Sequence, residues 1–292
     1  MKSSICTKAL NSSCLSEKEV KSLLKIAISA ANKGGEVLKK YYGNLKSIKN
    51  KGRVGDLVTN ADIEAEKIVI DYLSKETPDI AILAEESGIT NNKIDLKWCV
   101  DPLDGTTNFA HGYPFFATSI GLTYKDLPLL GSISIPFLNE NYSAAPGLGA
   151  FCNNNKIQVS KTTSLSNSLL VTGFAYDRHN RLDNNYAEFC WLTHRTRGVR
   201  RGGAAAVDLA FIASGRLDGY WERGLAKWDL AAGVAIVNEA GGSIKDYKNK
   251  EFNLESGRIL ACTPKIEKEI LQELSKVKPL EGKLFGAPEI KA

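Results

Sequence analysis

The stretch WCVDPLDGTTNF, residues 98–109, carries most of the structural and chemical information in this chain. Its first three residues are apolar and predict a buried strand that ends at Asp101. Asp104 follows three positions later, and Pro102 between the two acids predicts a turn. Such a turn would bring both carboxylates and the carbonyl oxygen of Leu103 toward one point.

This stretch has two interpretations. Asp, Pro and Gly are common turn residues, so it is compatible with a solvent-facing turn that caps a helix. An all-oxygen ligand cluster also suits a hard cation such as Mg²⁺, and two such cations stabilise the attacking and leaving oxygens of a phosphoryl transfer. The backbone N–H groups of Gly105 and Thr106, at a helix start, would then bind the phosphate. The stretch alone leaves both interpretations open.

Upstream, capping residues and hydrophobic periodicity predict two helices and one strand. These elements are expected over residues 16–43, 59–75 and 80–84, with a polar, basic loop around Lys51 between the helices. Glu85 follows the strand directly. The first sixteen residues predict a frayed N-terminus.

Downstream, runs rich in β-formers and separated by turn signals predict an antiparallel meander over residues 115–159. The remaining chain alternates strands with helices, and the helices are expected over 183–194, 204–215, 228–242 and the C-terminal segment. We therefore expect an α/β fold with an α+β half over residues 1–150 and an α/β half over 151–292, packed as one rigid unit.

Composition excludes several classes of protein. The 292 residues are 43% hydrophobic and 24% charged, as in ordinary globular domains. Since no stretch approaches the roughly 20 apolar residues that span a bilayer, we expect no membrane partner. The net charge of +5 is too mild for a dedicated nucleic-acid binder. Six scattered cysteines without a CxxC pair indicate reduced thiols and a cytoplasmic location.

Four ordered motifs resemble those of the inositol monophosphatase family. WCVDPLDGTTNF resembles its first signature and KWDLAAGVAIVNEAGG, residues 227–242, its second. DLVTNAD, residues 56–62, and LAEES, residues 83–87, are similar to two further family segments. The resemblance covers nearly the whole chain and implies the layered αβαβα sandwich of the inositol monophosphatase and fructose-1,6-bisphosphatase type.

The resemblance implies a metal site with two to three Mg²⁺ ions. Its ligands would be Glu85, Asp101, the Leu103 carbonyl, Asp104 and Asp229. Thr106 and Asp62 match the pair that orients and deprotonates the attacking water. Taken without the resemblance, Asp62 is better explained as a first-turn acid favoured by the helix dipole.

The resemblance also implies substrate contacts. The phosphate would be bound by Gly105, Thr106 and Lys51, and the alcohol by Gly203, Ala204, Ala205 and Glu222. Ala204 stands where many relatives carry Ser or Thr, which leaves the identity of the alcohol less certain than the reaction. The expected function is Mg²⁺-dependent hydrolysis of inositol 1-phosphate by a lithium-sensitive homodimer.

Other functions stay open at this point. Histidinol-phosphate and fructose-1,6-bisphosphate phosphatases share the metal motifs, whereas Thr107–Asn108 argues against the relatives that cleave nucleotide 3′-phosphates. The basic run over residues 195–201 allows a non-enzymatic role in binding nucleic acid or protein. Because this run has no interleaved aromatic residues, we favour a solvated face or a subunit contact.

Overall fold

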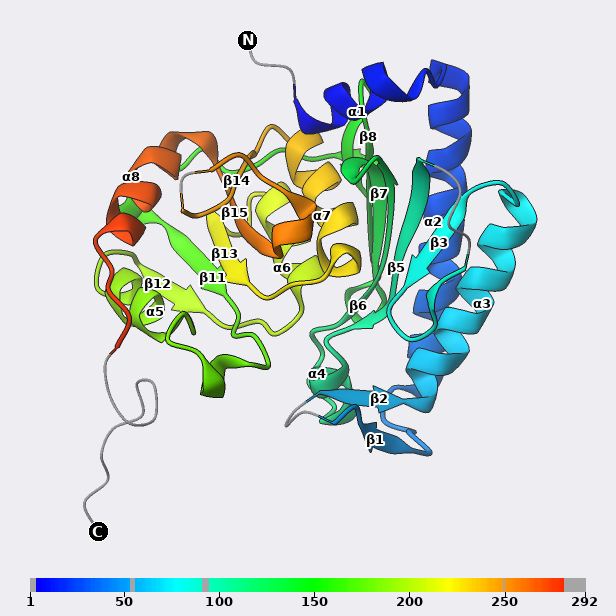
Figure 1. The fold of residues 1–292 in the computed structure, drawn as a ribbon, viewed down its shortest axis with the longest axis horizontal. Helices are drawn as coiled ribbons and strands as arrows, with labels where there is room; N and C mark the ends of the chain where they lie inside the picture. Colours follow the sequence, from blue (N-terminus) through cyan, green and yellow to red (C-terminus); the bar gives the residue numbers. More distant parts are fainter. Residues whose placement is uncertain (1–3, 53–55, 91–94, 249, 281–292) are drawn as a thin grey trace.

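In the part of the chain that the structure describes, the larger of the two main sheets has eight strands (Figure 1). The computed structural model describes residues 4–52, 56–90, 95–248 and 250–280. The sheet contains, in spatial order, β10 (Asn155–Lys156), β9 (Gly149–Cys152), β8 (Glu140–Ala145), β7 (Leu127–Ile135), β6 (Ala117–Tyr124), β5 (Leu96–Asp104), β3 (Ala81–Ala84) and β4 (Gly88–Ile89). Only β3 and β5 pair in parallel among these strands. The antiparallel meander expected over residues 115–159 is therefore confirmed.

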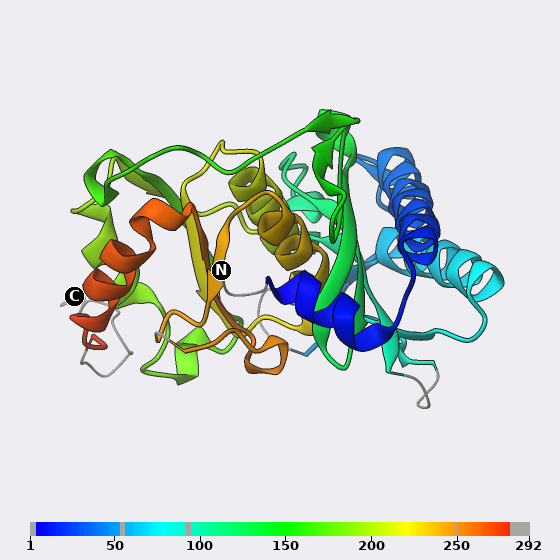
Figure 2. The same ribbon diagram turned by 90° about the horizontal axis from the view of Figure 1, so that it is seen from above.

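Two long helices, α2 (Glu17–Tyr41) and α3 (Asn60–Glu76), cover one face of this sheet (Figure 2). Each begins with a complete capping box, Ser16 with Glu19 and Thr59 with Asp62, as the sequence predicts. Close packing needs a small residue in α2, since a Cβ at Gly34 would lie 2.6 Å from the Thr118 side chain.

The opposite face is covered by α6 (Ala205–Ala213) and α7 (Lys227–Glu239), which lie between the two sheets (Figure 2). Strands β6 and β7 have glycines where α7 approaches, and a Cβ at Gly131 would lie 2.5 Å from the Cα of Ala232. The resulting core joins both sheets through α6 and α7. This contact places the start of each helix next to the end of β5.

The second sheet contains, in spatial order, β12 (Gly198–Arg200), β11 (Leu169–Thr172), β13 (Gly219–Arg223), β15 (Arg258–Cys262) and β14 (Ser243–Lys245). β11 runs parallel to β12 and β13, and the other pairs are antiparallel. Helices α5 (Tyr186–Thr193) and α8 (Pro264–Ser275) lie on its outer side. The layers are thus α, β, α, β, α, and the expected sandwich is confirmed.

The expectation of a frayed N-terminus is wrong for the described part of that segment. Helix α1 (Ile5–Ser13) begins at Ser4, whose side chain accepts a hydrogen bond from the backbone of Thr7. Cys6 and Ala9 are fully buried where α1 packs against β7 and α7. Two small buried residues give too weak a hydrophobic periodicity to predict a helix from the sequence. They are nevertheless enough to hold one face of α1 against the core.

The turn expected at Pro102 is also wrong. Strand β5 continues to Asp104 with a shift in register between Asp101 and Asp104. This irregularity accommodates a proline, which has no N–H to donate to the neighbouring strand. It also re-aims the two acids, because regular strand residues three apart point to opposite faces.

The basic loop expected around Lys51 instead contains a short hairpin. Strand β1 (Ile48–Asn50) pairs with β2 (Leu57–Thr59) in antiparallel fashion. Helix α4 (Thr106–Ala110) lies next to β2. None of the described helices combines the length and apolar composition that a bilayer crossing requires.

Candidate active site

A cavity of about 420 Å³ opens beside the end of β5. One wall comes from residues 51–107 and the other from residues 173–229. The predicted site residues in these walls are Lys51, Glu85, Asp101, Leu103, Asp104, Gly105, Thr106, Gly203, Ala204, Ala205, Glu222 and Asp229. Residues from both halves of the chain thus meet at one cavity.

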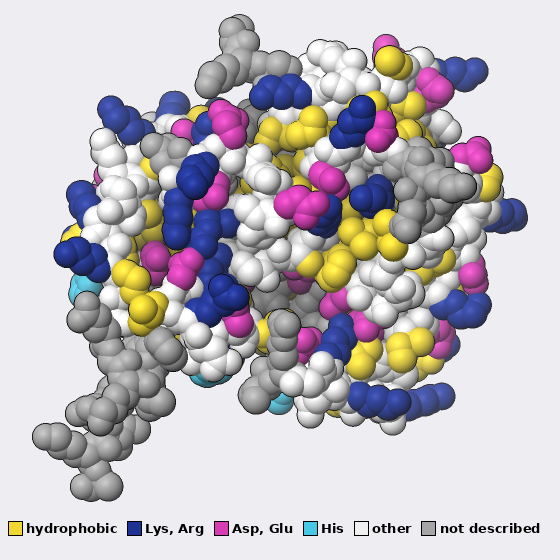
Figure 3. All heavy atoms as spheres, viewed as in Figure 1, with side chains coloured by type: hydrophobic (Ala, Val, Ile, Leu, Met, Phe, Trp, Pro, Cys, Tyr) yellow, Lys and Arg dark blue, Asp and Glu magenta, His cyan; other side chains and the backbone are white. Residues whose placement is uncertain are grey.

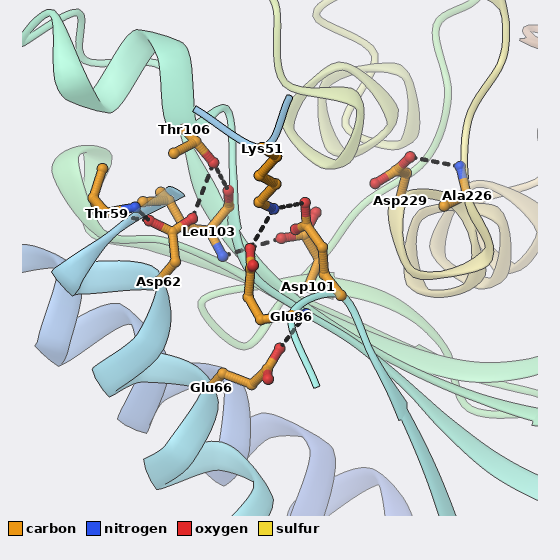
Figure 4. Close-up of polar contacts among 11 residues, drawn as sticks. Lys51, Thr59, Asp62, Glu66, Glu86, Asp101, Leu103, Thr106, Ala226 and Asp229 are labelled. Carbon is orange, nitrogen blue, oxygen red and sulfur yellow. Dashed lines mark hydrogen bonds and ion pairs between the residues drawn. The ribbon is translucent and has the colours of Figure 1, made fainter. Parts of the chain in front are cut away.

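Asp62 is fully buried and contacts Thr106, a residue of the cavity wall (Figure 4). Its Oδ2 accepts hydrogen bonds from the Thr59 backbone N–H at 2.8 Å and from the Thr59 hydroxyl at 2.6 Å. Its Oδ1 lies 3.0 Å from the Thr106 hydroxyl, which is also 3.0 Å from the Leu103 carbonyl oxygen. Asp62 therefore caps α3 and contacts Thr106 at the same time, so the two explanations of this residue are compatible.

Burial governs the charge of Asp62. It raises the pKa of this carboxyl, while the hydrogen bonds from Thr59 and Thr106 oppose the shift. A carboxylate with a raised pKa is a stronger base. This is the property that proton removal from a neighbouring hydroxyl or water requires.

Four carboxylates from three segments face the cavity. Burial raises the pKa of Glu85 to about 7, although the charge of Lys51 opposes it. Burial together with the charge of Asp104 raises the pKa of Asp229 to about 7. Burial also raises the pKa of Asp104 to about 7, although backbone hydrogen bonds from α6 oppose it. The pKa of Asp101 lies well above its usual range because of burial and the charges of Glu85 and Asp104. Such mutual repulsion indicates a site that needs a cation to be fully ionised.

Lys51 supplies part of the missing positive charge. Its ammonium lies 2.8 Å from Glu85 Oε1 and also pairs with Glu86 (Figure 4). Burial disfavours the ammonium, but the two carboxylates outweigh that effect and raise its pKa. The backbone N–H of Glu86 donates to Glu66 Oε2 at 2.8 Å, which ties this corner to α3.

The donor set fits Mg²⁺ in chemistry. Carboxylate and carbonyl oxygens are the ligands that this cation prefers, and a lysine ammonium already occupies a cationic position beside Glu85. Within residues 4–52, 56–90, 95–248 and 250–280, no three His, Cys, Asp or Glu side chains are already gathered at metal-ligand geometry. A bound cation would therefore have to draw the carboxylates together.

Gly105 shapes the turn between β5 and α4. Its φ of +88° is left-handed, and a Cβ there would lie 2.9 Å from the Phe115 carbonyl oxygen and 3.1 Å from the Ala204 Cβ. Glycine is needed at this position for both reasons. The turn delivers Thr106 to the first position of α4, with its side chain toward Asp62 (Figure 4).

Asp104 joins the two walls of the cavity. Its Oδ2 accepts a hydrogen bond from the backbone N–H of Ala206 at 2.6 Å, across 102 residues of sequence. Ala206 lies in the first turn of α6, where a carboxylate also complements the helix dipole. Asp229 is placed by a similar contact, 2.7 Å from the Ala226 N–H at the start of α7 (Figure 4).

Glu222 also lines the cavity. It is 9% exposed, and burial raises its pKa to about 7 against the opposing hydrogen bond from Tyr220. Asp208, on α6, has a buried Oδ1 with no hydrogen-bond partner among the described residues. Burial and the charge of Glu222 raise the pKa of Asp208 well above its usual range.

Several cavity residues were missed by sequence reasoning. Asp56, Tyr176, Arg178 and Trp228 line the cavity, but sequence analysis gave none of them a binding role. Asp56 belongs to the DLVTNAD motif and Trp228 immediately precedes Asp229, so these two had a usable signal. Tyr176 and Arg178 follow β11 in an irregular segment, and no pattern marks them.

The basic run over residues 195–201 does not act as one surface. The Arg195 guanidinium lies 3.2 Å from the centre of the Trp191 ring and 2.7 Å from Glu273. Arg201 instead lines the cavity. Lys and Arg side chains are interspersed with Asp and Glu over the face drawn in Figure 3. The arrangement does not favour a dedicated nucleic-acid interface.

Comparisons with known proteins agree with this geometry. The profile of the inositol monophosphatase family matches residues 19–278. The chain is 52% identical to an inositol-1-monophosphatase from Synechocystis over 89% of this chain and 91% of that protein. It is 41% identical to the Nus factor SuhB of Pseudomonas aeruginosa over 85% of this chain and 94% of that protein.

A solved structure shows the same fold. The inositol monophosphatase from Anabaena superposes with a TM-score of 0.83 at 47% identity, covering 90% of this chain and 98% of that one. The matched segment contains every predicted site residue. The chain therefore belongs to the inositol monophosphatase family and is a phosphatase of that fold.

Proposed function

We propose that this phosphatase is Mg²⁺-dependent and that inositol 1-phosphate is its substrate. The observation that carries the proposal is the meeting of Glu85, Asp101, Asp104 and Asp229 at one cavity, beside the Thr106–Asp62 contact. The names of the Synechocystis and Anabaena proteins support this substrate.

The carboxylates and one carbonyl would hold the cations. We assign one Mg²⁺ to Glu85, Asp101 and the Leu103 carbonyl, a second to Asp101, Asp104 and Asp229, and a third, weaker ion to Glu85 alone. Bound Mg²⁺ supplies two effects, a lowered pKa for coordinated water and charge stabilisation at the phosphate oxygens. The high pKa values of these side chains mean that protons compete with the cation.

Thr106 and Asp62 would activate the attacking water. The Thr106 oxygen can accept a hydrogen bond from that water while its own proton points to Asp62 Oδ1, 3.0 Å away. As the water gives a proton to the Thr106 oxygen, the Thr106 hydroxyl proton passes to Asp62, whose raised pKa favours protonation. Since Thr59 holds the other oxygen of Asp62, the base stays oriented toward Thr106.

The phosphate would lie against the start of α4. The backbone N–H groups of Gly105 and Thr106 are the donors that we assign to it, and the helix dipole favours an anion there. Lys51 neutralises Glu85 and Glu86 in the structure. We expect a cation at Glu85 to free the Lys51 ammonium for the phosphate.

The alcohol would occupy the end of the cavity formed by Gly203, Ala204, Ala205 and Glu222. Three small residues leave room for a ring, and Glu222 can accept hydrogen bonds from its hydroxyls. The departing alkoxide must gain one proton, and a lowered pKa of nearby water is the chemistry that Mg²⁺ held by the carboxylates would supply for it.

A substrate panel tests the proposal. We would compare kcat/KM in Mg²⁺ for inositol 1-phosphate, histidinol phosphate, fructose 1,6-bisphosphate and a nucleoside 3′,5′-bisphosphate, with EDTA as the control. Inositol 1-phosphate should give the highest value, and EDTA should abolish turnover. A clearly higher value for another ester would refute the substrate. Tight RNA binding at physiological salt without any turnover would favour the binding role of the basic run.

The remaining family properties are also proposals for this chain. We infer inhibition by lithium, a homodimer and a cytoplasmic location. All six cysteines are free thiols, as a reducing compartment requires. Light scattering would test the dimer, and a lithium titration at fixed Mg²⁺ would test inhibition.

A further inference from the structure

Tyr220 and Glu222 lie two positions apart on β13, so both side chains project from the same face of the sheet. That face packs against α6, and Tyr220 is fully buried in the core there. Trp221, between them, projects to the opposite face and joins a separate core cluster. The strand thus holds Tyr220 beside Glu222, which lines the cavity.

The Tyr220 hydroxyl donates a hydrogen bond of 2.6 Å to Glu222 Oε2. Burial and the charge of Glu222 raise the pKa of Tyr220 well above its usual range, so the hydroxyl keeps its proton and remains a donor. Among the described residues, no hydrogen bond reaches the other oxygen, Oε1. Oε2 of this cavity-lining carboxylate therefore accepts the Tyr220 hydrogen bond, and Oε1 can accept one from a substrate.

Gly173 restricts the same carboxylate from the other side. It follows β11, the parallel neighbour of β13, and a Cβ built there would overlap both oxygens of Glu222. Its φ is not left-handed, so a larger residue at this position would displace the Glu222 carboxylate without straining the backbone. The Glu222 carboxylate thus packs against the backbone of Gly173, and the hydrogen bond from Tyr220 holds it in that position.

We propose that Tyr220 is a positioning residue that fixes Glu222 with Oε1 turned to the leaving alcohol. It thereby favours phosphate esters whose alcohol carries a hydroxyl at that place. A carboxylate held in one orientation pays less ordering entropy when it binds that hydroxyl than a freely rotating one. The inference rests on the proposed function, because it assumes that Glu222 contacts the alcohol.

The first test is Tyr220→Phe, which removes one hydroxyl and keeps the ring. The substrates are inositol 1-phosphate and p-nitrophenyl phosphate, whose alcohol has no hydroxyl to offer Glu222. The ratio of their kcat/KM values should fall about 10- to 100-fold, the effect of one hydrogen bond to a charged group. The loss should appear mainly in KM for inositol 1-phosphate.

Tyr142→Phe is the matched control. Tyr142 is also fully buried and donates a 2.8 Å hydrogen bond to a glutamate two positions away, Glu140, but it is not part of the cavity wall. This variant should leave the ratio unchanged. Equal losses of thermal stability in the two variants would separate folding effects from selectivity.

Gly173→Ala tests the same carboxylate without touching Tyr220. The added methyl should displace Glu222 and lower the ratio to a similar degree. Gly198→Ala, on the neighbouring strand β12, is its control, because a Cβ there meets nothing closer than the flexible end of Arg200, at 3.2 Å, and does not approach Glu222. In a Glu222→Gln background, Tyr220→Phe should give less than a twofold further loss, since the two changes act through one carboxylate.

The outcomes separate this inference from the proposed function. An unchanged ratio in Tyr220→Phe, or equal losses for both substrates, would overturn the role of Tyr220. A wild-type enzyme that hydrolyses p-nitrophenyl phosphate but not inositol 1-phosphate would refute the proposed substrate instead. In that case a crystal structure of Tyr220→Phe decides the inference: Glu222 displaced from Gly173 supports positioning, and Glu222 in place contradicts it.

Discussion

The Thr106 hydroxyl and Asp62 Oδ1 lie 3.0 Å apart although 44 residues separate them in the chain. The first turn of α3 and the first turn of α4 thus meet at one hydrogen bond. A single Thr106 proton cannot serve Asp62 and the Leu103 carbonyl fully at once, although both lie at 3.0 Å. In the proposed reaction the Asp62 contact is the productive one.

Thr106→Ala should therefore slow the chemical step. We expect kcat to fall about 10²- to 10³-fold, the range for loss of a general-base contact, while KM changes little. Steady-state kinetics with inositol 1-phosphate measure both constants. Thr123→Ala is the control, since Thr123 is also buried but donates to the Lys97 carbonyl, away from the cavity. Near-normal kcat in Thr106→Ala would exclude the proton relay.

Asp104→Asn should abolish turnover and preserve the fold. The amide oxygen can still accept the hydrogen bond from the Ala206 N–H, so the start of α6 keeps its contact. The negative charge for Mg²⁺ is lost, and we expect kcat to fall at least about 10³-fold. Kinetics and circular dichroism should be measured together. Activity within tenfold of wild type would contradict the metal assignment.

Metal-free protein should lose stability as pH rises from about 4 to about 7. Glu85, Asp104 and Asp229 have folded-state pKa values of about 7, above their usual values near 4. The native state therefore binds more protons than the unfolded state in this window, and the free energy of unfolding falls with pH. Comparison with Asp104→Asn isolates this contribution from other titrating groups.

Mg²⁺ should reverse that loss. Because the cation needs ionised ligands, it should raise the Tm more at pH 7.5 than at pH 5.5. Thermal unfolding with Mg²⁺ and with EDTA at both pH values provides the measurement. An equal increase at both pH values would show that these carboxylates do not titrate with the cation.

Helix α1 should contribute to stability. Ala9 is fully buried, so Ala9→Gln forces a longer polar side chain into the contact with β7 and α7 and should cost about 1–3 kcal/mol. Ser12→Gln, on the exposed side of the same helix, is the control. Urea unfolding of both variants gives the difference. Equal midpoints would mean that α1 does not support the fold.

Sequence reasoning succeeded where local chemistry determines local structure. The capping boxes at Ser16 and Thr59 start helices in the sequence and in the structure. Most of the predicted site residues meet because they lie near the end of a strand or in the first turn of a helix, and those ends converge. Asp229 could be grouped with Asp101 only through the family resemblance, since no local pattern links residues so far apart.

Tertiary packing determined what sequence reasoning missed. Pro102 signals a turn locally, but pairing with β6 on both sides keeps the strand going through a bulge. Ala9 and Cys6 carry little hydrophobic signal, and only the surface of β7 and α7 makes them a core. The restraint on the Glu222 carboxylate could likewise not be predicted, because only the tertiary structure shows that Gly173 lies beside it.

The hydrogen bond from the Ala206 N–H to Asp104 has a practical consequence. A cut in the irregular stretch between Ile157 and Ser164 would leave Asp104 on one fragment and Asp229 on the other. Neither fragment would contain a whole catalytic centre. Two such pieces, fused to a pair of interacting proteins, should regain turnover only on association, and the enzyme could then serve as a split reporter.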